Sequence, residues 1–558
     1  MEKIWLKSYE KGVPSEIELD DYPSIVEFLE ESVSKYFKRP AFKNFDKVMS
    51  YAELDRYSQE YAGYLQNHLK LKKGDRIAIM MPNLLQYPVA MFGALRAGLV
   101  VVNVNPLYTP REIIHQMNDA QCETIIVLAN FAHVLEEALP KTQIKNIVVT
   151  EIGDLLPIHK RHIINFVVRH IKRMVPSYNL PTAVTFRETL KLGAKSPYHR
   201  VKLNHDDIAF LQYTGGTTGV AKGAVLTHGN MLANAKQVVV WIERLTKNEP
   251  QIMVTPLPLY HIFSLLANLL VFMRMGSLNL LITNPRDIGG FIKILKQSNF
   301  TAMTGVNTLF NALMHHKHFK DIDFSQVKLC LGGGMAVQKA VAEKWLEITG
   351  KPLTEGYGLT EASPVVCATP MHIKEFTGSI GLPLPSTDIK VIDDEGNELP
   401  VGEPGELCVK GPQVMKEYWN MPEETAKVLS DDGWLKTGDV AKIDEKGFVY
   451  IVDRKKDMIV VSGFNVYPNE VEDVLAHHPG IKEVAVIGVE DGRSTEAVKA
   501  FIVKNDPMLD ERAVRHYASE SLTAYKRPKL IEFVDELPKS NVGKILRREL
   551  REEAKKKQ

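Results

Sequence analysis

The sequence predicts an α/β protein built from more than one domain, and three observations support this prediction. The chain has 558 residues, which is too long for a single hydrophobic core. Apolar runs alternate with helical stretches through residues 75–150, a pattern typical of α/β layers. Residues 376–455 are rich in glycine and proline and indicate a β-rich subdomain. We therefore expect a large N-terminal domain of two α/β layered subdomains plus a β-rich subdomain, followed by a small α+β C-terminal domain.

The elements of the first α/β unit follow in order between residues 76 and 149. Short apolar runs predict its strands, and the longer stretch 85–97 predicts a helix. The expected strands are 76–80, 99–102, 124–127 and 146–149. Two further runs, 253–255 and 327–331, are separated by helical stretches and predict a second α/β unit.

A charged segment, residues 453–457, separates the β-rich subdomain from the end of the chain. Before it, runs such as 389–392 and 405–409 predict strands. After it, the chain predicts a small domain of a size that folds alone, with a helix at 468–477 and strands at 484–488 and 498–503. We therefore divide the chain into an N-terminal domain of residues 1–452, a connecting segment of residues 453–457 and a C-terminal domain of residues 458–558.

Composition excludes several classes of protein. The 69 basic and 68 acidic residues nearly cancel, so no general attraction to nucleic acid is expected. The cysteines lie far apart without a Cys-x-x-Cys pair, which argues against disulfides or structural zinc and favours a reducing cytoplasm. They are Cys122, Cys330, Cys367 and Cys408. The N-terminus lacks an apolar signal core, and the longest apolar stretch, residues 263–278, includes Asn268 and Arg274, so no membrane span is expected.

Residues 160–175 form a basic amphipathic stretch in which Lys and Arg alternate with apolar side chains. On a helix the apolar set would cover about half the circumference. Such a helix lies either on an anionic membrane surface or with its apolar face against the domain core. Because most amphipathic helices pack on a core, we favour the second arrangement.

The most informative tract runs from Tyr213 to Gly223 and contains four glycines, three threonines and one lysine. Glycine lets consecutive N–H groups converge on an anion, threonine adds hydroxyl donors and lysine adds a charge. This composition favours a phosphate-binding loop for a nucleotide triphosphate, with an ordinary glycine-rich turn as the alternative. The candidate residues are Tyr213, Thr214, Gly215, Gly216, Thr217, Thr218, Gly219, Lys222 and Gly223.

Apolar runs on both sides of this tract predict a hairpin-like arrangement of two strands. A Walker loop would end in Gly-Lys-Ser/Thr and open a helix, whereas Lys222 is followed by Gly223. The tract also lacks the Gly-x-Gly-x-x-Gly spacing. It is therefore neither a P-loop nor a Rossmann fingerprint.

The tract and four later motifs together resemble the acyl-adenylate-forming superfamily, which includes acyl-CoA synthetases, luciferases and the adenylation domains of peptide synthetases. The motifs occur in the family's order at 213–223, 356–361, 437–439, 453–457 and 538–544. From Trp5 to Arg548 the chain resembles the bacterial long-chain fatty-acid–CoA ligases, and residues 81–88 match that group closely.

This resemblance implies ATP-dependent activation of long-chain fatty acids to acyl-CoA through an acyl-adenylate, with release of pyrophosphate and AMP. Such a reaction feeds fatty-acid degradation and lipid metabolism and uses ATP, Mg²⁺ and coenzyme A. Three alternatives remain: loading of a carrier protein, luciferase-like oxygenation, and a catalytically dead nucleotide-binding or lipid-shuttling protein. Peripheral contact with the cytoplasmic face of an anionic membrane and a homodimer also stay open.

The resemblance also implies roles for individual residues. Thr214 and Lys222 would act on the ATP phosphates, and Glu361 would hold Mg²⁺ through its hard carboxylate oxygens. Taken alone, Glu361 could equally be a solvated glutamate. The remaining nucleotide contacts are expected from Gly333, Gly334, Tyr357, Gly358, Thr360, Asp439 and Arg454, with Tyr357 along the adenine, Thr360 near the α-phosphate, and Asp439 and Arg454 at the ribose.

Lys544 would contact the carboxylate and the α-phosphate during adenylation and offset charge in the transition state. Because it lies in the C-terminal domain, it must leave before the thiol arrives. The resemblance makes Lys456 the hinge for that motion. Coenzyme A would then enter near Ser462, Gly463 and Phe464.

The acyl site is expected around His261 and Gly305. His261 would lie near the carboxylate, although a structural histidine fits the sequence equally well. Residues 257–270 and 301–313 contain no Asp or Glu. An enzyme that activates amino acids needs an acid for the substrate ammonium, so this segment favours an uncharged acyl chain.

Overall fold

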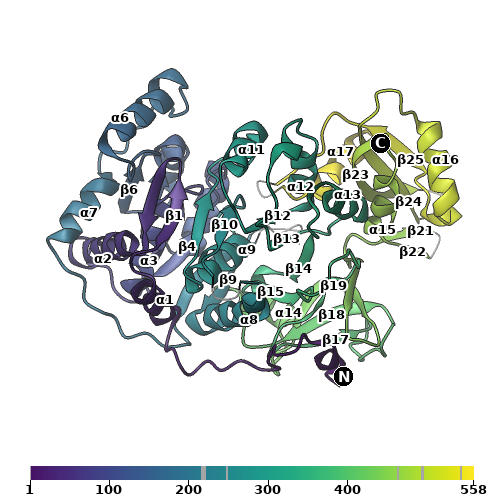
Figure 1. Ribbon diagram of the computed structural model, residues 1–558, viewed down its shortest axis with the longest axis horizontal. Helices are drawn as coiled ribbons and strands as arrows, with labels where there is room; N and C mark the ends of the chain where they lie inside the picture. Colours follow the sequence, from purple (N-terminus) through teal and green to yellow (C-terminus); the bar gives the residue numbers. More distant parts are fainter. Residues whose placement is uncertain are drawn as a thin grey trace.

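The computed structural model describes residues 2–214, 221–246, 249–461, 464–491, 495–540 and 543–557. Within these residues the strands form sheets of seven, nine, four and five strands, arranged in a large domain and a small domain (Figure 1). The expected α/β fold, with its β-rich subdomain and small α+β C-terminal domain, is confirmed.

The seven-stranded sheet is parallel except at one edge. In spatial order its strands are β7 (Val184–Thr185), β6 (Asn146–Thr150), β5 (Thr124–Leu128), β3 (Arg76–Met80), β4 (Val100–Asn103), β8 (Ile208–Thr214) and β9 (Lys222–Thr227). Helices α4 (Pro110–Asp119) and α5 (Ala132–Ala138) bury their apolar side chains on one face, and α3 (Gln86–Arg96) covers the other. The antiparallel β8–β9 pair confirms the expected hairpin.

The nine-stranded sheet holds the second α/β unit. Its order is β16 (Leu382–Pro383), β15 (Val365–Ala368), β14 (Thr354–Gly358), β13 (Leu329–Gly333), β12 (Ala302–Gly305), β10 (Ile252–Thr255), β11 (Leu278–Leu281), β1 (Pro40–Asn44) and β2 (Lys47–Ser50). Three helices pack on one face through a buried aromatic cluster: α11 (Ile288–Lys296), α12 (Asn307–Met314) and α13 (Lys339–Thr349). The long helix α8 (His228–Thr246) packs in the main core of the large domain.

The β-rich subdomain is an antiparallel sheet of β17 (Asp388–Ile392), β18 (Gly405–Lys410), β19 (Leu435–Ile443) and β20 (Val449–Arg454). Strand β20 leads through a turn into the small domain. That domain contains β21 (Ile459–Val461), β22 (Phe464–Val466), β23 (Ile481–Asp491), β24 (Thr495–Lys504) and β25 (Leu530–Phe533), with α15 (Pro468–Ala476), α16 (Glu511–Ser521) and α17 (Arg547–Lys557). Helix α15 of the small domain packs beside α13 of the large domain (Figure 1).

The basic amphipathic stretch folds as α6 (Ile158–Phe166) and a π-helical turn, η4 (Val167–Ile171), which project from the large domain (Figure 1). Neither segment contains a buried residue. Ile163, Phe166 and Ile171 are 61%, 58% and 65% exposed. The favoured packing of this apolar face on the core is therefore wrong for most of the face, because only Ile164 of α6 packs partly against the core while these three side chains are exposed. Within the described ranges, no helix is long and apolar enough to cross a membrane.

Candidate active site

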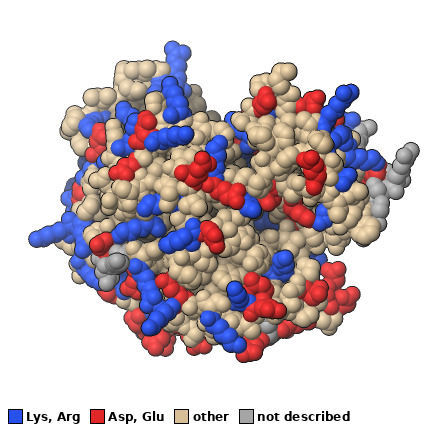
Figure 2. Space-filling view, turned by 45° about the vertical axis from the view of Figure 1, so that its right-hand side comes forward, with Lys and Arg blue, Asp and Glu red and all other residues tan. Residues whose placement is uncertain are grey.

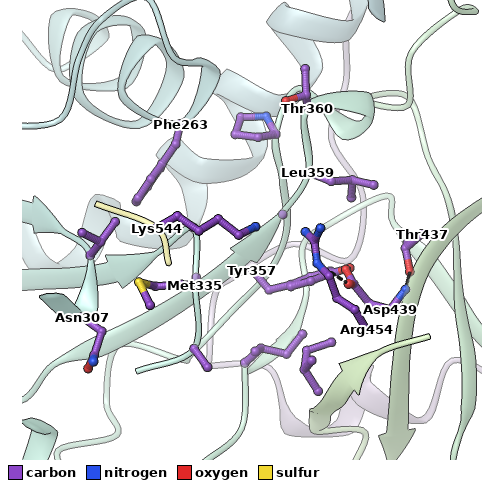
Figure 3. Close-up of a pocket in the computed structure, with 18 of the residues that line it drawn as sticks. Phe263, Asn307, Met335, Tyr357, Leu359, Thr360, Thr437, Asp439, Arg454 and Lys544 are labelled. Atoms are coloured by element: carbon purple, nitrogen blue, oxygen red, sulfur yellow. Dashed lines mark hydrogen bonds and ion pairs between the residues drawn. The ribbon is translucent and has the colours of Figure 1, made fainter. Parts of the chain in front are cut away.

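A cavity of about 2020 Å³ lies between the two domains. Its walls come from the carboxyl ends of β13 and β14, from β19 and β20 of the β-rich subdomain, and from the segment around Lys544 in the small domain (Figure 3). In sheets with parallel strands, ligands commonly bind at these carboxyl ends. The cavity collects most of the described site residues predicted from the sequence.

The β8–β9 hairpin brings Thr214 and Lys222 to one side of this cavity. The two residues face each other in the antiparallel register. The Lys222 ammonium contacts the Glu424 carboxylate and lies 5.0 Å from the centre of the Tyr418 ring. Hydrogen bonds from Lys222 and Lys427 lower the pKa of Glu424 to about 2. The predicted positions Gly215, Gly216, Thr217, Thr218 and Gly219 lie outside the described residues.

Two further predicted positions complete this strand pair. Gly223 lies in β9 opposite Tyr213, and a Cβ at Gly223 would lie 3.0 Å from the tyrosine ring. The Tyr213 hydroxyl donates a hydrogen bond of 2.5 Å to Asp119 of α4. Tyr213 therefore ties the hairpin to the first sheet's helical layer while its ring lines the cavity.

Glu361 follows β14 in a short 3₁₀ turn, Thr360–Ala362. The Tyr418 hydroxyl donates to Oε1 of Glu361 at 2.6 Å, and both Thr360 and Glu361 line the cavity. Among the described residues no group of three or more His, Cys, Asp or Glu side chains could hold a metal ion. A single carboxylate nevertheless fits Mg²⁺, which commonly keeps its waters and takes its other ligands from substrate phosphates.

Glycine allows two strands to approach closely beside the cavity. A Cβ on Gly358 would lie only 2.0 Å from the carbonyl oxygen of Pro364, so no other residue fits there. Gly333 lies against the backbone of Gly356, where a Cβ would come within 2.9 Å of its oxygen. Gly334 follows with φ of +76° and lines the cavity. Gly334 and Gly358 line the cavity together with Tyr357, whereas Gly333 is not among its lining residues.

A hydrogen bond and an ion pair connect Tyr357, Asp439 and Arg454 (Figure 3). The Tyr357 hydroxyl donates to Asp439 Oδ2 at 2.6 Å, and the Arg454 Nε lies 3.4 Å from Asp439 Oδ1. The pairing of β19 with β20 places Asp439 directly opposite Arg454. Burial and the adjacent Asp439 raise the pKa of Tyr357 above its ordinary value. A carboxylate held this way can accept hydrogen bonds from two neighbouring hydroxyl groups.

Lys544 enters the cavity from the small domain, and its ammonium points towards Tyr357 and Arg454 (Figure 3). Burial, followed by repulsion from Arg454, lowers the pKa of Lys544 to about 7. On the same wall, burial and then Lys544 lower the pKa of His261 to about 4. The Phe263 amide donates to Nδ1 of His261 at 3.3 Å. The neutral ring therefore carries its proton on Nε2.

The turn after β20 contains Lys456, whose pKa is lowered by burial and by Arg454. The acids on either side of this turn are bound by the small domain. Arg547 lies 3.6 Å from Asp453 and 3.5 Å from Asp457. The Asn469 amide donates to Asp453 at 2.8 Å. Sequence reasoning missed Arg547, because charges almost a hundred residues apart leave no local pattern.

An apolar pocket adjoins His261. It is lined by Leu257, Phe263, Ala267, Val306, Leu331 and Met335. Gly305 is not among the residues that line the cavity, and a Cβ there would lie 2.7 Å from the Phe310 ring. A bulky residue at Gly305 would therefore disturb the core beneath the pocket instead of filling the pocket, which corrects that expectation.

A second apolar wall was not expected from the sequence. It runs between α8 and the strands of the nine-stranded sheet and is lined by Val238, Trp241, Ile242, Leu329, Val365 and Ala368. The Trp241 indole donates to the Thr369 carbonyl at 3.2 Å, which fixes its ring. The apolar pattern of α8 indicates a buried helix but not that part of it faces a cavity.

Phe464 lies away from the other site residues. It is 56% exposed and stacks on Tyr525 with the ring centres 4.8 Å apart, and it does not line the cavity. Its predicted neighbours Ser462 and Gly463 lie outside the described residues.

The cavity pairs a half lined by charged and polar side chains with an apolar half, and a lysine from a separate domain enters it. This arrangement is typical of a two-domain enzyme that joins a nucleotide to an apolar substrate. The model of the AMP-binding enzyme matches residues 29–419, and that of the AMP-binding enzyme C-terminal domain matches residues 470–544. The chain belongs to the AMP-binding enzyme family, as its resemblance to acyl-adenylate-forming proteins predicted.

Several relatives are similar over nearly their whole length. A long-chain-fatty-acid–CoA ligase of Escherichia coli O6:H1 is 57% identical, with 100% of this chain and 99% of the relative covered. The ligase of the same name from Bacillus subtilis is 38% identical over 99% and 98% of the two chains. 4-Coumarate–CoA ligase 1 of Solanum tuberosum is 32% identical over 93% and 92%.

Solved structures agree with this fold. The anthranilate CoA ligase AuaEII in complex with anthranoyl-AMP superimposes with a TM-score of 0.87 at 25% identity, covering 97% of this chain and 99% of that one. ATP-bound MatB from Rhodopseudomonas palustris gives a TM-score of 0.77 at 28% identity, covering 94% and 98%.

Proposed function

We propose that this enzyme converts long-chain fatty acids into acyl-CoA in two steps. The fatty-acid carboxylate first attacks the α-phosphorus of ATP, which forms an acyl-adenylate and releases pyrophosphate. The thiol of coenzyme A then attacks the acyl carbon and releases AMP. The observation that carries the proposal is the meeting of Lys544, the Tyr357–Asp439–Arg454 group and an apolar pocket in one cavity of an AMP-binding enzyme.

The first step must overcome the repulsion between two anions. Lys222 supplies positive charge at the end of the β8–β9 hairpin, and Lys544 supplies it where the carboxylate would meet the α-phosphate. Holding both reactants in line can lower the barrier by about 7–11 kcal/mol. No nucleophile from the protein is required, so the side chains act through charge and position.

The nucleotide would occupy the polar half of the cavity. Its adenine would lie along the Tyr357 ring, near Gly333 and Gly334. Asp439 would accept hydrogen bonds from both ribose hydroxyls, with Arg454 at its side. Glu361 would hold Mg²⁺, which neutralises phosphate charge when bound.

The acyl chain would occupy the apolar half. The neutral His261 would donate from Nε2 to the carboxylate, which orients it towards the nucleotide. Each buried methylene contributes about 0.8 kcal/mol, so ten of them approach about 8 kcal/mol and could dominate substrate affinity. The wall formed by α8 and the nine-stranded sheet gives a long chain room beyond the pocket near His261.

Lys544 must withdraw before the thiol can reach the acyl carbon. We assign the pivot to Lys456 in the connecting segment, residues 453–457, so that residues 458–558 turn against residues 1–452. Ser462, Gly463 and Phe464 would then border the entry path of coenzyme A. Such a path explains why Phe464 lies away from the cavity in the present arrangement of the domains.

Peripheral membrane contact is a second part of the proposal. The exposed apolar side chains of α6 and η4 stand beside Arg169, Lys172 and Arg173. In Figure 2 basic and acidic side chains are mixed over the visible face, so a local basic helix would bind anionic lipid without a large single-sign surface. Long-chain acids partition into bilayers, and a docked cytoplasmic enzyme would collect them there.

The test measures CoA-dependent AMP formation across a series of saturated fatty acids. We expect turnover to rise with chain length, to peak among long-chain acids and to be weak with acetate. If acetate or coumarate gave the highest kcat/KM, the long-chain assignment would be overturned. Transfer to a carrier protein in preference to free coenzyme A would favour the carrier-loading alternative.

A further inference from the structure

Several hydrogen bonds between the small domain and the large domain involve neither the Lys544 side chain nor the Tyr357–Asp439–Arg454 group. The clearest is at the start of α13, where the N-cap residue Gln338 makes no side-chain capping bond. Instead Asp473, from α15 of the small domain, accepts a hydrogen bond of 3.1 Å from the Lys339 amide. An acidic side chain at a helix N-terminus satisfies an amide that lacks an intrahelical partner and also interacts favourably with the helix dipole.

Gln338 is engaged with the neighbouring helix. The backbone N–H of Gln338 donates to Asn307 Oδ1 at 3.0 Å, and the Asn307 side-chain amide donates back to Gln338 Oε1 at 3.0 Å. This reciprocal pair joins the N-termini of α12 and α13 into one surface. The small domain therefore meets two helix ends that are already fixed to each other.

Thr308, one residue further along α12, reaches the segment that carries Lys544. Its hydroxyl donates a hydrogen bond of 2.9 Å to the carbonyl of Gly543. Gly543 has φ of +82°, and a Cβ there would lie 2.8 Å from the Thr308 Oγ1. Only glycine can take this conformation so close to Thr308. The bond therefore fixes the backbone immediately before Lys544.

A third bond supports the same orientation, since the Asn311 side chain donates to the Lys482 carbonyl at 3.1 Å. Two of these bonds connect the N-terminal ends of α12 and α13 to the small domain, and the third comes from the middle of α12. None of them can persist if the small domain turns about the connecting segment.

We propose that the N-terminal ends of α12 and α13 form a latch for the adenylation half-reaction, with Thr308 and Asp473 as positioning residues that hold Lys544 in the cavity. This inference rests on the proposed two-step function. The latch consists of a few ordinary hydrogen bonds, each with a modest net contribution to stability. It can therefore fix the lysine and still release the small domain once the adenylate has formed.

The test separates the two half-reactions in the full-length enzyme. Acid-dependent pyrophosphate release reports the first, and AMP release from synthetic acyl-adenylate plus coenzyme A reports the second. In Thr308→Val and in Asp473→Ala we expect kcat for pyrophosphate release to fall roughly three- to tenfold, with KM for ATP nearly unchanged. The second half-reaction should keep its rate, and Thr308→Ser should restore the first because it keeps the donor.

Matched controls are Thr182→Val and Asp535→Ala, which alter exposed residues that no cross-domain bond uses. Neither should change either half-reaction. In a Lys544→Ala background, Thr308→Val should cause no further loss, because the threonine acts through the lysine.

Unchanged pyrophosphate release in both Thr308→Val and Asp473→Ala would overturn the latch, and so would equal loss in both half-reactions. If the melting temperature shows that one variant folds poorly, pyrophosphate release by the other variant tests the latch. Failure of the wild-type enzyme to release pyrophosphate with any fatty acid would instead overturn the proposed function.

Discussion

Under the proposed function, Lys544 is the residue on which the chemistry depends most directly. Lys544→Ala should reduce pyrophosphate release by several orders of magnitude, because the buried cation is lost where the carboxylate meets the α-phosphate. AMP release from supplied acyl-adenylate should remain close to the wild-type rate. Equal loss of both half-reactions would show that Lys544 is not confined to the first. Rapid-quench measurement of each half-reaction separates these outcomes.

The same lysine predicts a pH dependence. Burial lowers its pKa to about 7, so the free enzyme holds the cation below that pH and loses it as the pH rises. The kcat/KM of the first half-reaction reports the free enzyme. We expect this kcat/KM to fall above about pH 7. In Lys544→Arg the side chain keeps its charge, so kcat/KM should not fall over this pH range. A wild-type profile that stays flat through pH 9 would contradict the prediction.

Ile242 is expected to limit acyl-chain length. Ile242 and Leu329 line both the large cavity and a small void of about 10 Å³, which also touches Leu245, Phe272 and Ala302. Ile242→Ala should join these spaces and move the chain-length maximum towards longer acids. The substitution should also cost about 2–5 kcal/mol of stability. Val365→Ala is the control, because Val365 lines the cavity but not the void.

At the scale of the element, α6 and η4 show that a helical sequence pattern predicts a helix but not its neighbours. The spacing of apolar residues predicted a helix with two faces, and that helix is present. The pattern could not say what the apolar face meets, since this depends on where the helix stands relative to the core. Here most of the apolar face is exposed, and only Ile164 of α6 packs partly against the core.

The charges on this helix give a prediction for membrane contact. Replacement of Arg169, Lys172 and Arg173 by Gln should weaken binding to anionic vesicles, because each basic side chain near such a surface contributes about 1 kcal/mol. Activity on detergent-dispersed fatty acid should stay unchanged. Neutral phosphatidylcholine vesicles are the control. Undiminished binding to anionic vesicles would remove α6 from the membrane proposal.

The β8–β9 hairpin illustrates what the sequence could predict. Apolar runs on both sides of a glycine-rich tract predict two paired strands, because this whole pattern lies within one short stretch of sequence. The wall along α8 and the Asp453–Arg547 contact could not be predicted in this way. Each joins elements that are adjacent only after the chain has folded.

At the scale of the whole molecule, the connecting segment should control the second half-reaction. Lys456→Pro fixes φ at that position and also restricts Lys455. We expect pyrophosphate release to continue and thioester formation to fall strongly. Lys456→Ala removes the side chain but leaves the backbone free to rotate, so it should retain both steps. The comparison of the two variants therefore separates the effect of the side chain from the effect of the backbone rotation. Normal thioester formation in Lys456→Pro would place the pivot elsewhere.

The contact between Lys222 and Glu424 has a consequence for how ligands enter and leave. Under the proposed function, Glu424 would be a counterion built into the chain, and an incoming phosphate would displace its carboxylate from Lys222. When pyrophosphate departed, Glu424 would return to the Lys222 ammonium. This exchange of anions would lower the electrostatic penalty of releasing a multiply charged product and would also weaken the binding of that product.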